Sequence, residues 1–210
     1  MADHPQVFLA SRNPKKIAEM QRILAEHVPD VEVLGLDDVT PYDEPAETEP
    51  TFEGNALIKA RAGVAATGLP SIADDSGLCV DALNGMPGVL SARWAGTAKD
   101  DAANNRLLLE QLEDVPDERR TAHFACAVAF AVPGDQGVAE HGVHGEMRGR
   151  IIRELRGSGG FGYDVVFVAD DTADGRTSAE LPPDEKDAIS HRGRALRVLA
   201  PQVAGALTRP

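Results

Sequence analysis

Cysteine and basic residues are scarce in this chain, and each scarcity excludes a class of function. The only cysteines are Cys79 and Cys126, which stand too far apart to form a CxxC redox pair or a thiolate zinc site. We expect both to be small core residues. Lys and Arg number 21 against 34 Asp and Glu, giving a formal net charge of -13. This charge argues against a nucleic acid or an anionic membrane as the main partner.

Long apolar runs are also missing. No stretch of about 18 apolar residues occurs, and the N-terminal "MADHPQVFLASRN" has no basic segment followed by an apolar core. We therefore expect a cytoplasmic protein. The 42% apolar and 26% charged residues form an ordinary globular mixture. At 210 residues, the chain is long enough for a single domain over 1–210, with two lobes sharing one core.

Helical and strand patterns alternate along the chain. Strands are predicted at 7–10, 31–36, 70–74, 122–132, 138–154 and 164–169. Helices are predicted from Pro14, over 52–68 with Gly68 closing the helix, from about Asp100, and from Ser190 to the tail. Acidic segments at 41–51 and 169–185 are predicted to be surface loops beside a site. The alternation predicts an α/β fold around a mixed sheet.

The segment "SRNPKK" (11–16) lies where a strand turns into a helix. Asn13 and Pro14 are N-cap and first-turn signals, so Lys15 and Lys16 fall in the first helical turn. Cations are unfavourable there because the helix N-terminus already carries free N–H groups and partial positive charge. Either the two lysines are solvated, or the segment binds a phosphate chain.

The segment "SIADDSG" (71–77) places two acids after a short apolar strand. Successive side chains of a strand face opposite ways, so Asp74 and Asp75 should diverge. A carboxylate at a strand end can hold Mg²⁺ against phosphate oxygens or take a proton from water. The alternative is an Asx-type turn in "DDSG". Asn55 and Lys59, four apart, share one face of the preceding helix, whose neighbours Ala62, Gly63 and Ala66 are small enough for close packing.

The segment "GSGGFG" (157–162) matches G-x-G-x-x-G, but the following "YDVVFVA" is predicted to be a strand, which excludes a dinucleotide fingerprint. The glycines instead allow close approach to a ligand, with Phe161 or Tyr163 stacking on a base, or they form a hairpin. Farther on, Ser190 can cap a helix that begins with His191 and Arg192. Bases at a helix start favour an acidic or carbonyl-bearing neighbour.

Six segments in order, from Ser11 to Arg194, closely resemble the inosine triphosphate pyrophosphatase family: "SRNPKK", "TFEGNALIKARA", "ADDSGL", "GMPGVLSARWAG", "GGFGYD" and "EKDAISHRG". The resemblance implies an elongated α/β fold, with a mixed central sheet flanked by helices and two lobes around an active-site cleft. It also implies a homodimer that hydrolyses ITP, dITP or XTP to the monophosphate and pyrophosphate with Mg²⁺, cleansing the nucleotide pool.

The resemblance also assigns roles to residues of this sequence. Asp75 is the implied proton acceptor and a metal ligand, and Glu47 is the second metal ligand. Lys59 is implied to be a catalytic residue whose positive charge contacts the phosphates. Asp74 is expected to brace the turn or to support the site from behind. The implied substrate-binding residues are Ser11, Arg12, Asn13, Pro14, Lys15 and Lys16 for the triphosphate, Asn55 and Ser76 beside it, and Phe161, Gly162, Tyr163, Asp164, Lys186, His191 and Arg192 for the base.

The sequence departs from the family pattern at five positions. Met147 and Arg148 replace a common Trp-Pro pair, Leu155 and Val165 stand where proline is usual, and Glu49 where glycine is usual. Glu49 would either substitute for Glu47 or interfere with it. The competing interpretations are a pyrophosphatase for other modified nucleotides and a non-catalytic nucleotide-binding module. An aspartyl-phosphate phosphatase would need Asp-x-Asp, which "DDS" does not supply.

Overall fold

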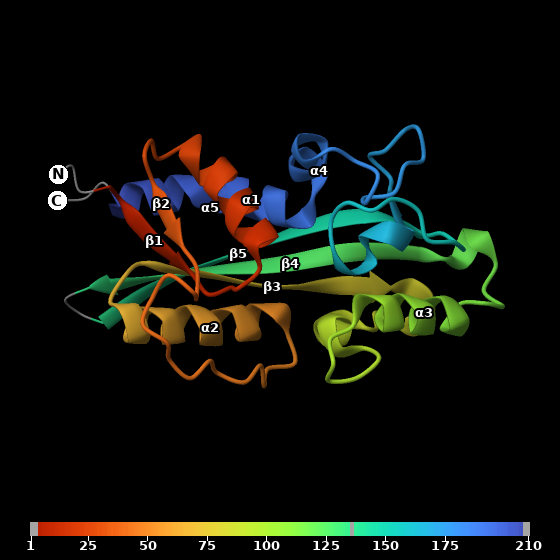
Figure 1. Ribbon diagram of the computed structural model, residues 1–210, viewed down its shortest axis with the longest axis horizontal. Coiled ribbons are helices and arrows are strands. Elements are labelled where there is room, and N and C mark those ends of the chain that lie inside the picture. Colours follow the sequence, from red (N-terminus) through yellow and green to blue (C-terminus); the bar gives the residue numbers. More distant parts are fainter. Residues whose placement is uncertain (1–3, 135–136, 208–210) are drawn as a thin grey trace. The chain divides into compact units, whose positions relative to one another are not determined.

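The computed structural model describes residues 4–134 and 137–207 (Figure 1). Its strands are β1 (Gln6–Leu9), β2 (Glu32–Leu34), β3 (Ser71–Val80), β4 (Thr121–Gly134), β5 (Gly137–Ile151) and β6 (Phe167–Ala169). Its α-helices are α1 (Pro14–Ala25), α2 (Phe52–Thr67), α3 (Asp101–Gln111), α4 (Pro183–Ile189) and α5 (His191–Leu207). Short 3-10 helices lie at Asp81–Leu83, Gly88–Arg93, Asp117–Arg119 and Gly162–Val166.

The six strands form one sheet in the order β2-β1-β3-β4-β5-β6. β1 is parallel to both β2 and β3, whereas β5 and β6 are antiparallel. The sheet is therefore mixed and is flanked by helices, which confirms the predicted α/β class. Among the described residues, no helix combines the length and the apolar character that crossing a membrane requires.

The described residues fall into two compact units. Unit 1 is built from Met1–Asp75, Cys126–His144 and Arg192–Pro210. Unit 2 is built from Ser76–Ala125 and Gly145–His191.

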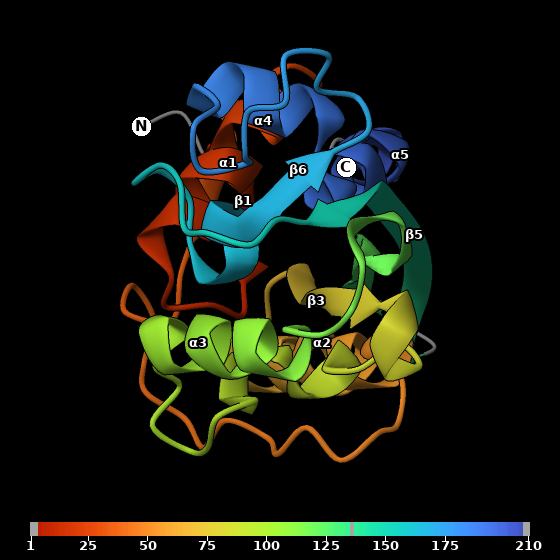
Figure 2. The same cartoon turned by 90° about the vertical axis from the view of Figure 1, so that its right-hand side faces the viewer.

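In unit 1, α1 and α5 cover one face of the strands and α2 covers the other (Figures 1 and 2). Alternation along the strands divides the core accordingly. Ile72, Val128 and Phe130 pack with α1 and α5, whereas Ala73 and Ala129 pack with α2. The predicted alternation of small and larger residues in 122–132 is thus the division between a bulky layer and an alanine layer.

The alanine layer lets α2 approach the sheet closely. At Gly63, an added Cβ would lie 2.2 Å from Ser71 Oγ and 2.9 Å from the Phe8 ring, so no side chain fits there. Gly68 ends the helix in the left-handed region, with φ of 71°, as predicted. Ala62 is partly buried and Ala66 is exposed, so the close packing comes from Gly63 and the alanines of the neighbouring face.

In unit 2, α3 and α4 lie on opposite sides of the strands (Figure 2). The core joins Leu108, Phe124, Met147 and Phe167, all of them buried. The Arg120 guanidinium is buried as well, and it donates to the carbonyls of Leu112 (2.5 Å) and Ile151 (3.0 Å). Arg120 therefore satisfies carbonyls at the end of α3 and at the end of β5.

Both cysteines behave as the sequence indicates for residues without a reactive thiolate. Cys126 is buried in the core of unit 1, and burial raises the pKa of its thiol to about 12. Cys79 is partly buried, and burial raises its pKa to about 11.

Three local predictions were wrong. β3 does not end at the two acids but continues to Val80, so "DDSG" is strand and not an Asx turn. The strand predicted over 164–169 begins only at Phe167, because residues 162–166 form a 3-10 helix. The Phe161 N–H donates to the Asp164 carboxylate (2.8 Å) and closes this turn before β6. The predicted loop 169–185 ends early, because α4 begins at Pro183, a residue suited to a first helical turn.

We expect Gly63→Ala to lower the free energy of unfolding by about 1–3 kcal/mol, because its Cβ overpacks α2 against Ser71. Gly205→Ala in α5 is the matched control, since its Cβ meets nothing within 4 Å. There, replacing glycine in a helix should raise stability by about 0.5 kcal/mol. Urea unfolding of both variants checks this; equal effects would contradict close packing at Gly63.

Candidate functional site

The turn before α1 is arranged as the sequence predicts. The Asn13 side chain caps the helix by accepting from the Lys15 N–H (3.0 Å), and Ser11 Oγ accepts from the Asn13 N–H (3.1 Å). Pro14 is the first helical residue. Arg12 is half exposed and pairs with Asp37 (3.4 Å) and with Glu44. The exposed Lys15 and the half-buried Lys16 follow in the first turn.

Asp74 is the centre of a buried ion cluster in unit 1. Its Oδ2 accepts from Lys16 Nζ (2.9 Å) and from Arg192 Nε and Nη2 (3.2 and 3.1 Å). Arg192 also pairs through Nη1 with Glu19 (2.9 Å). Burial alone would raise the pKa of Asp74, but Lys16 and Arg192 outweigh it and hold that pKa far below its ordinary value. Asp74 is therefore ionised and fully engaged.

This cluster bears on two expectations. Asp74 cannot brace a turn, because the strand continues past it. Arg192, expected beside a base, donates to Asp74 and Glu19, and its role at the base stays a prediction. Both Lys16 and Arg192, which the sequence marked as cations at helix starts, thus have an acidic neighbour in the core of unit 1. The sequence did not single out Glu19, because a lone acid on an amphipathic helix ordinarily faces solvent.

Asp75 points to the opposite face, as the strand period predicts. Its Oδ2 accepts from Asn55 Nδ2 (3.0 Å), and its Oδ1 lies 3.6 Å from Lys59 Nζ. Asn55 Oδ1 also accepts from the Glu49 N–H (2.9 Å), so this buried amide ties the carboxylate to the acidic loop 41–51. Burial raises the pKa of Asp75, with Lys59 opposing and Glu47 adding to the rise.

Lys59 lies between two carboxylates. Its Nζ donates to Glu47 Oε1 (2.9 Å) and to the Asp74 carbonyl (2.7 Å), in addition to facing Asp75. Burial alone would lower the pKa of Lys59, but Asp75, Asp74 and Glu47 together raise it. The ammonium is therefore charged and holds the acids in place.

The donor set fits a magnesium ion that is shared with a phosphate chain. Glu47 and Asp75 both face the Lys59 ammonium, at 2.9 and 3.6 Å, so their carboxylates lie close together. Mg²⁺ in phosphate sites commonly takes one or two protein carboxylates, with phosphate and water oxygens completing its shell. No group of three or more His, Cys, Asp or Glu side chains that could hold a metal alone occurs in residues 4–134 and 137–207.

Glu49 lies over the first turn of α2. A Cβ built on Gly54 would be 2.6 Å from the Glu49 Cβ and 3.3 Å from its Oε2. Negative charge is favourable at a helix N-terminus, which gives this departure from the family pattern a local reason.

In unit 2, the structure brings together three of the residues expected at the base. Asp164 accepts from the Phe161 N–H (2.8 Å) and from Lys186 Nζ (2.5 Å). Lys186 Nζ also lies 5.0 Å from the Phe161 ring centroid, a cation–π distance. Tyr163 is buried and donates its hydroxyl to the Ser91 carbonyl (2.9 Å), so of the two predicted rings only Phe161 is placed to stack on a ligand.

His191 and Ser76 belong to unit 2, whereas their chain neighbours Arg192 and Asp75 belong to unit 1. The His191 ring is 6% exposed and stacks on Phe124 at 4.9 Å and 11°. Ser76 lies in β3 and is partly buried. The roles predicted for these two residues at the substrate stay predictions.

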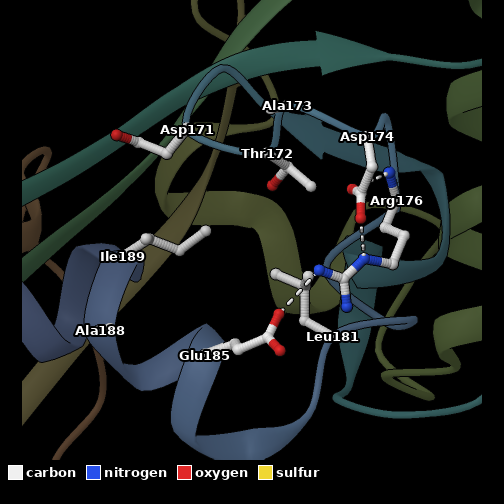
Figure 3. A pocket seen from close by; sticks show the side chains of 9 residues that line it. All are labelled: Asp171, Thr172, Ala173, Asp174, Arg176, Leu181, Glu185, Ala188 and Ile189. Carbon is white, nitrogen blue, oxygen red and sulfur yellow. Dashed lines mark hydrogen bonds and ion pairs between the residues drawn. The ribbon is translucent and has the colours of Figure 1, made fainter.

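A cavity of about 380 Å³ lies beside α4 (Figure 3). Glu185, Ala188 and Ile189 line it from the helix, and Arg176, on the side opposite Ile189, pairs with Asp174 (2.6 Å) and Glu185 (2.8 Å). Its remaining lining residues are Asp171, Thr172, Ala173 and Leu181. None of the predicted site residues lines it, so the cavity is separate from the Phe161–Asp164–Lys186 cluster.

Comparison with known proteins identifies the family. Residues 7–202 match the model of the Ham1 family. The chain is 61% identical over 205 residues to a protein of Nocardia farcinica named dITP/XTP pyrophosphatase, covering 97% of each chain. It is 55% identical over 209 residues to a protein of Mycobacterium tuberculosis with the same name, covering 99% of this chain and all of that one. The chain belongs to the Ham1 family.

Solved structures agree with this Ham1 membership. A crystal structure from Mycobacterium abscessus, described as a nucleoside-triphosphatase and dITP/XTP pyrophosphatase, is 56% identical with a TM-score of 0.73, covering 93% of this chain and 99% of that one. A HAM1 protein from Coxiella burnetii is 42% identical with a TM-score of 0.82, covering 96% and 99%. The family resemblance predicted from the six segments is confirmed.

We expect the neighbouring acids of this Ham1 protein to respond oppositely to the same substitution. Asp74→Asn should lower the free energy of unfolding by about 3 kcal/mol at pH 7, because it leaves Lys16 without its buried counter-charge and leaves Arg192 with Glu19 alone. The lowered pKa of Asp74 means that its stabilisation is complete above the ordinary value of 3.8 and is lost only as pH falls below it.

Asp75→Asn is the control. A raised carboxyl pKa means that stability falls as pH rises through that pKa, so the ionised group lowers stability at pH 7. Its replacement should leave the urea midpoint unchanged or higher. Equal destabilisation by both variants would contradict the division between the two acids.

Proposed function

We propose that this Ham1-family protein is a nucleoside triphosphate pyrophosphatase that hydrolyses ITP, dITP and XTP to the monophosphate and pyrophosphate, with Mg²⁺ as its cofactor. The observation that carries the proposal is Asp75. It is a largely buried carboxylate, held by Asn55 and facing Lys59 and Glu47. The neighbouring acid, Asp74, is already paired with two cations. The curated relatives named dITP/XTP pyrophosphatase support the substrate class.

The reaction breaks the bond between the α-phosphorus and the oxygen that bridges to the β-phosphate. A water oxygen forms the new bond to the α-phosphorus, its proton passes to the Asp75 carboxylate, and the bridging oxygen leaves with pyrophosphate. Asn55 and Lys59 would hold the Asp75 carboxylate in place to accept this proton. The Lys59 ammonium stabilises the charge that develops on the leaving pyrophosphate.

Glu47 and Asp75 would hold the magnesium ion, which when bound neutralises charge on the phosphate oxygens. The turn from Ser11 to Lys16 would bind the phosphate chain through its N–H groups and cations. Lys16 can serve both Asp74 and a phosphate, because its side chain is 20% exposed.

The base would be bound by the residues of unit 2. Phe161 offers its ring face, and Lys186 offers donors for the 6-oxo group that ITP and XTP have and ATP lacks. A donor facing the amino group of adenine would be left unpaired, which costs about 1–3 kcal/mol, or roughly tenfold to a hundredfold in selection.

The departures from the family pattern leave these groups in place. Met147 is fully buried in the core of unit 2, where its flexible side chain fills space that a larger ring would take. Leu155 is 59% exposed, and Arg148 is an exposed partner of Glu146 at 3.8 Å. Val165 packs at the edge of the unit 2 core. The homodimer and the cytoplasmic location stay predictions.

The purified protein with Mg²⁺ should release pyrophosphate and monophosphate rapidly from ITP, dITP and XTP, and more slowly from ATP, which lacks the 6-oxo group. Chromatography that separates monophosphate plus pyrophosphate from diphosphate plus phosphate tests the bond. EDTA should stop the reaction, because two carboxylates facing a phosphate chain repel it without a cation. Diphosphate products would overturn the proposed reaction.

Asp75→Asn should lower kcat by about 10²–10⁴-fold, as expected when a general base is removed, while nucleotide binding persists. Asp117→Asn is the control, because Asp117 is an exposed acid that pairs only with Arg153 among its described ion pairs (2.7 Å). Its kcat should match the unsubstituted protein. Full activity of Asp75→Asn would remove Asp75 from the chemistry.

A further inference from the structure

Two residues of α3 form hydrogen bonds to the backbone of Gly162. Asp101 Oδ2 accepts from the Gly162 N–H (2.8 Å), and Asn105 Nδ2 donates to the Gly162 carbonyl (2.9 Å). Asp101 and Asn105 are one helical turn apart and so share a face. Asn105 also donates to the Asp101 carbonyl (2.7 Å) and is 2% exposed, which fixes its amide.

These two bonds determine the conformation of Gly162. Its N–H belongs to the peptide plane before its Cα, and its carbonyl belongs to the plane after it. Because peptide planes are rigid, holding both planes sets φ and ψ. Gly162 needs this restraint, since it has φ of +61° and glycine is the residue with the most conformational freedom.

Gly162 lies between an anchored ring and a ring that is placed for a ligand. Tyr163, which follows it, is fixed by the hydrogen bond to Ser91. Phe161, which precedes it, is partly buried, and its ring lies under Lys186. The φ and ψ angles of Gly162 therefore set the orientation of Phe161 relative to the anchored Tyr163.

Asn105 lowers the stability of the fold in one respect, which indicates that the two hydrogen bonds it donates have a role beyond packing. Its Oδ1 is buried without a hydrogen-bond partner in the described parts of the chain. A buried unpaired acceptor lowers stability, so an apolar side chain would suit this position better if packing were its only role.

We propose that Asp101 and Asn105 are positioning residues for base recognition, which set the orientation of the Phe161 ring toward the purine without touching the nucleotide. The inference rests on the proposed function, because it takes the Phe161–Asp164–Lys186 cluster as the place where the base binds. It predicts that the pair affects ligands that carry a base and leaves ligands without one unaffected.

The two products of the proposed reaction separate these effects. IMP carries the base and pyrophosphate does not, and neither is consumed. By calorimetry with Mg²⁺, Asp101→Ala and Asn105→Ala should each weaken IMP binding about tenfold, as expected for about 1.4 kcal/mol, and leave pyrophosphate binding within about twofold. Asp101→Asn should stay within about threefold for IMP, because its amide oxygen can still accept from Gly162.

Asn104→Ala is the matched control. Asn104 is also a buried amide of α3, but it accepts from the Ala95 N–H (2.7 Å) and donates to the Ala92 carbonyl (3.1 Å). It should lose stability much as Asn105→Ala does, yet its ratio of IMP to pyrophosphate affinity should stay that of the unsubstituted protein.

Equal weakening of IMP and pyrophosphate by Asn105→Ala, or the same IMP loss in Asn104→Ala, would show a general structural role and overturn the proposal. An unsubstituted protein that fails to bind IMP would overturn it too. Normal IMP binding without release of pyrophosphate from any triphosphate would instead refute the proposed activity and leave the positioning pair standing.

Discussion

The buried pairing of Asp74 with Arg192 and Lys16 is the interaction on which unit 1 depends. It joins β3 to the first turn of α1 and to the start of α5, two helices that also pack together on the bulky layer of the core. Buried charges are tolerated only when they are paired, so these elements must assemble together for any one of them to be stable. The interaction also neutralises one of two adjacent acids.

The pairing of Asp74 with Lys16 and Arg192 leaves Asp75 as the acid of this pair that faces α2. Because successive strand residues face opposite ways, one dipeptide supplies a structural charge to one layer and, in the proposed function, a reactive charge to the other. Asn55 and Lys59, four apart on α2, then receive Asp75 on a single helix face. In unit 2, one carboxylate oxygen likewise has two partners. Asp164 Oδ2 accepts from the Phe161 N–H, which closes the turn, and from Lys186 Nζ.

Local rules predicted those features that depend on local geometry. The Asn13 cap, the Gly68 helix end, the divergence of Asp74 and Asp75, and the shared face of Asn55 and Lys59 all follow from the periods of helices and strands. The pairing of Arg192 with Asp74 spans 118 positions, and that of Asn105 with Gly162 spans 57, so no periodicity could indicate them. Helix α4 was missed because "PPDE" is equally typical of a loop.

The alanine layer between α2 and the strands acts as a spacer of fixed thickness. Methyl groups have no rotamers with which to yield, and close-packed interiors compress little. The separation between Lys59 on the helix and Asp75 on the strand is therefore as stiff as the core itself. Ala129 and Ala131, whose side chains carry no polar group, therefore help to fix the distance between the Lys59 ammonium and the Asp75 carboxylate.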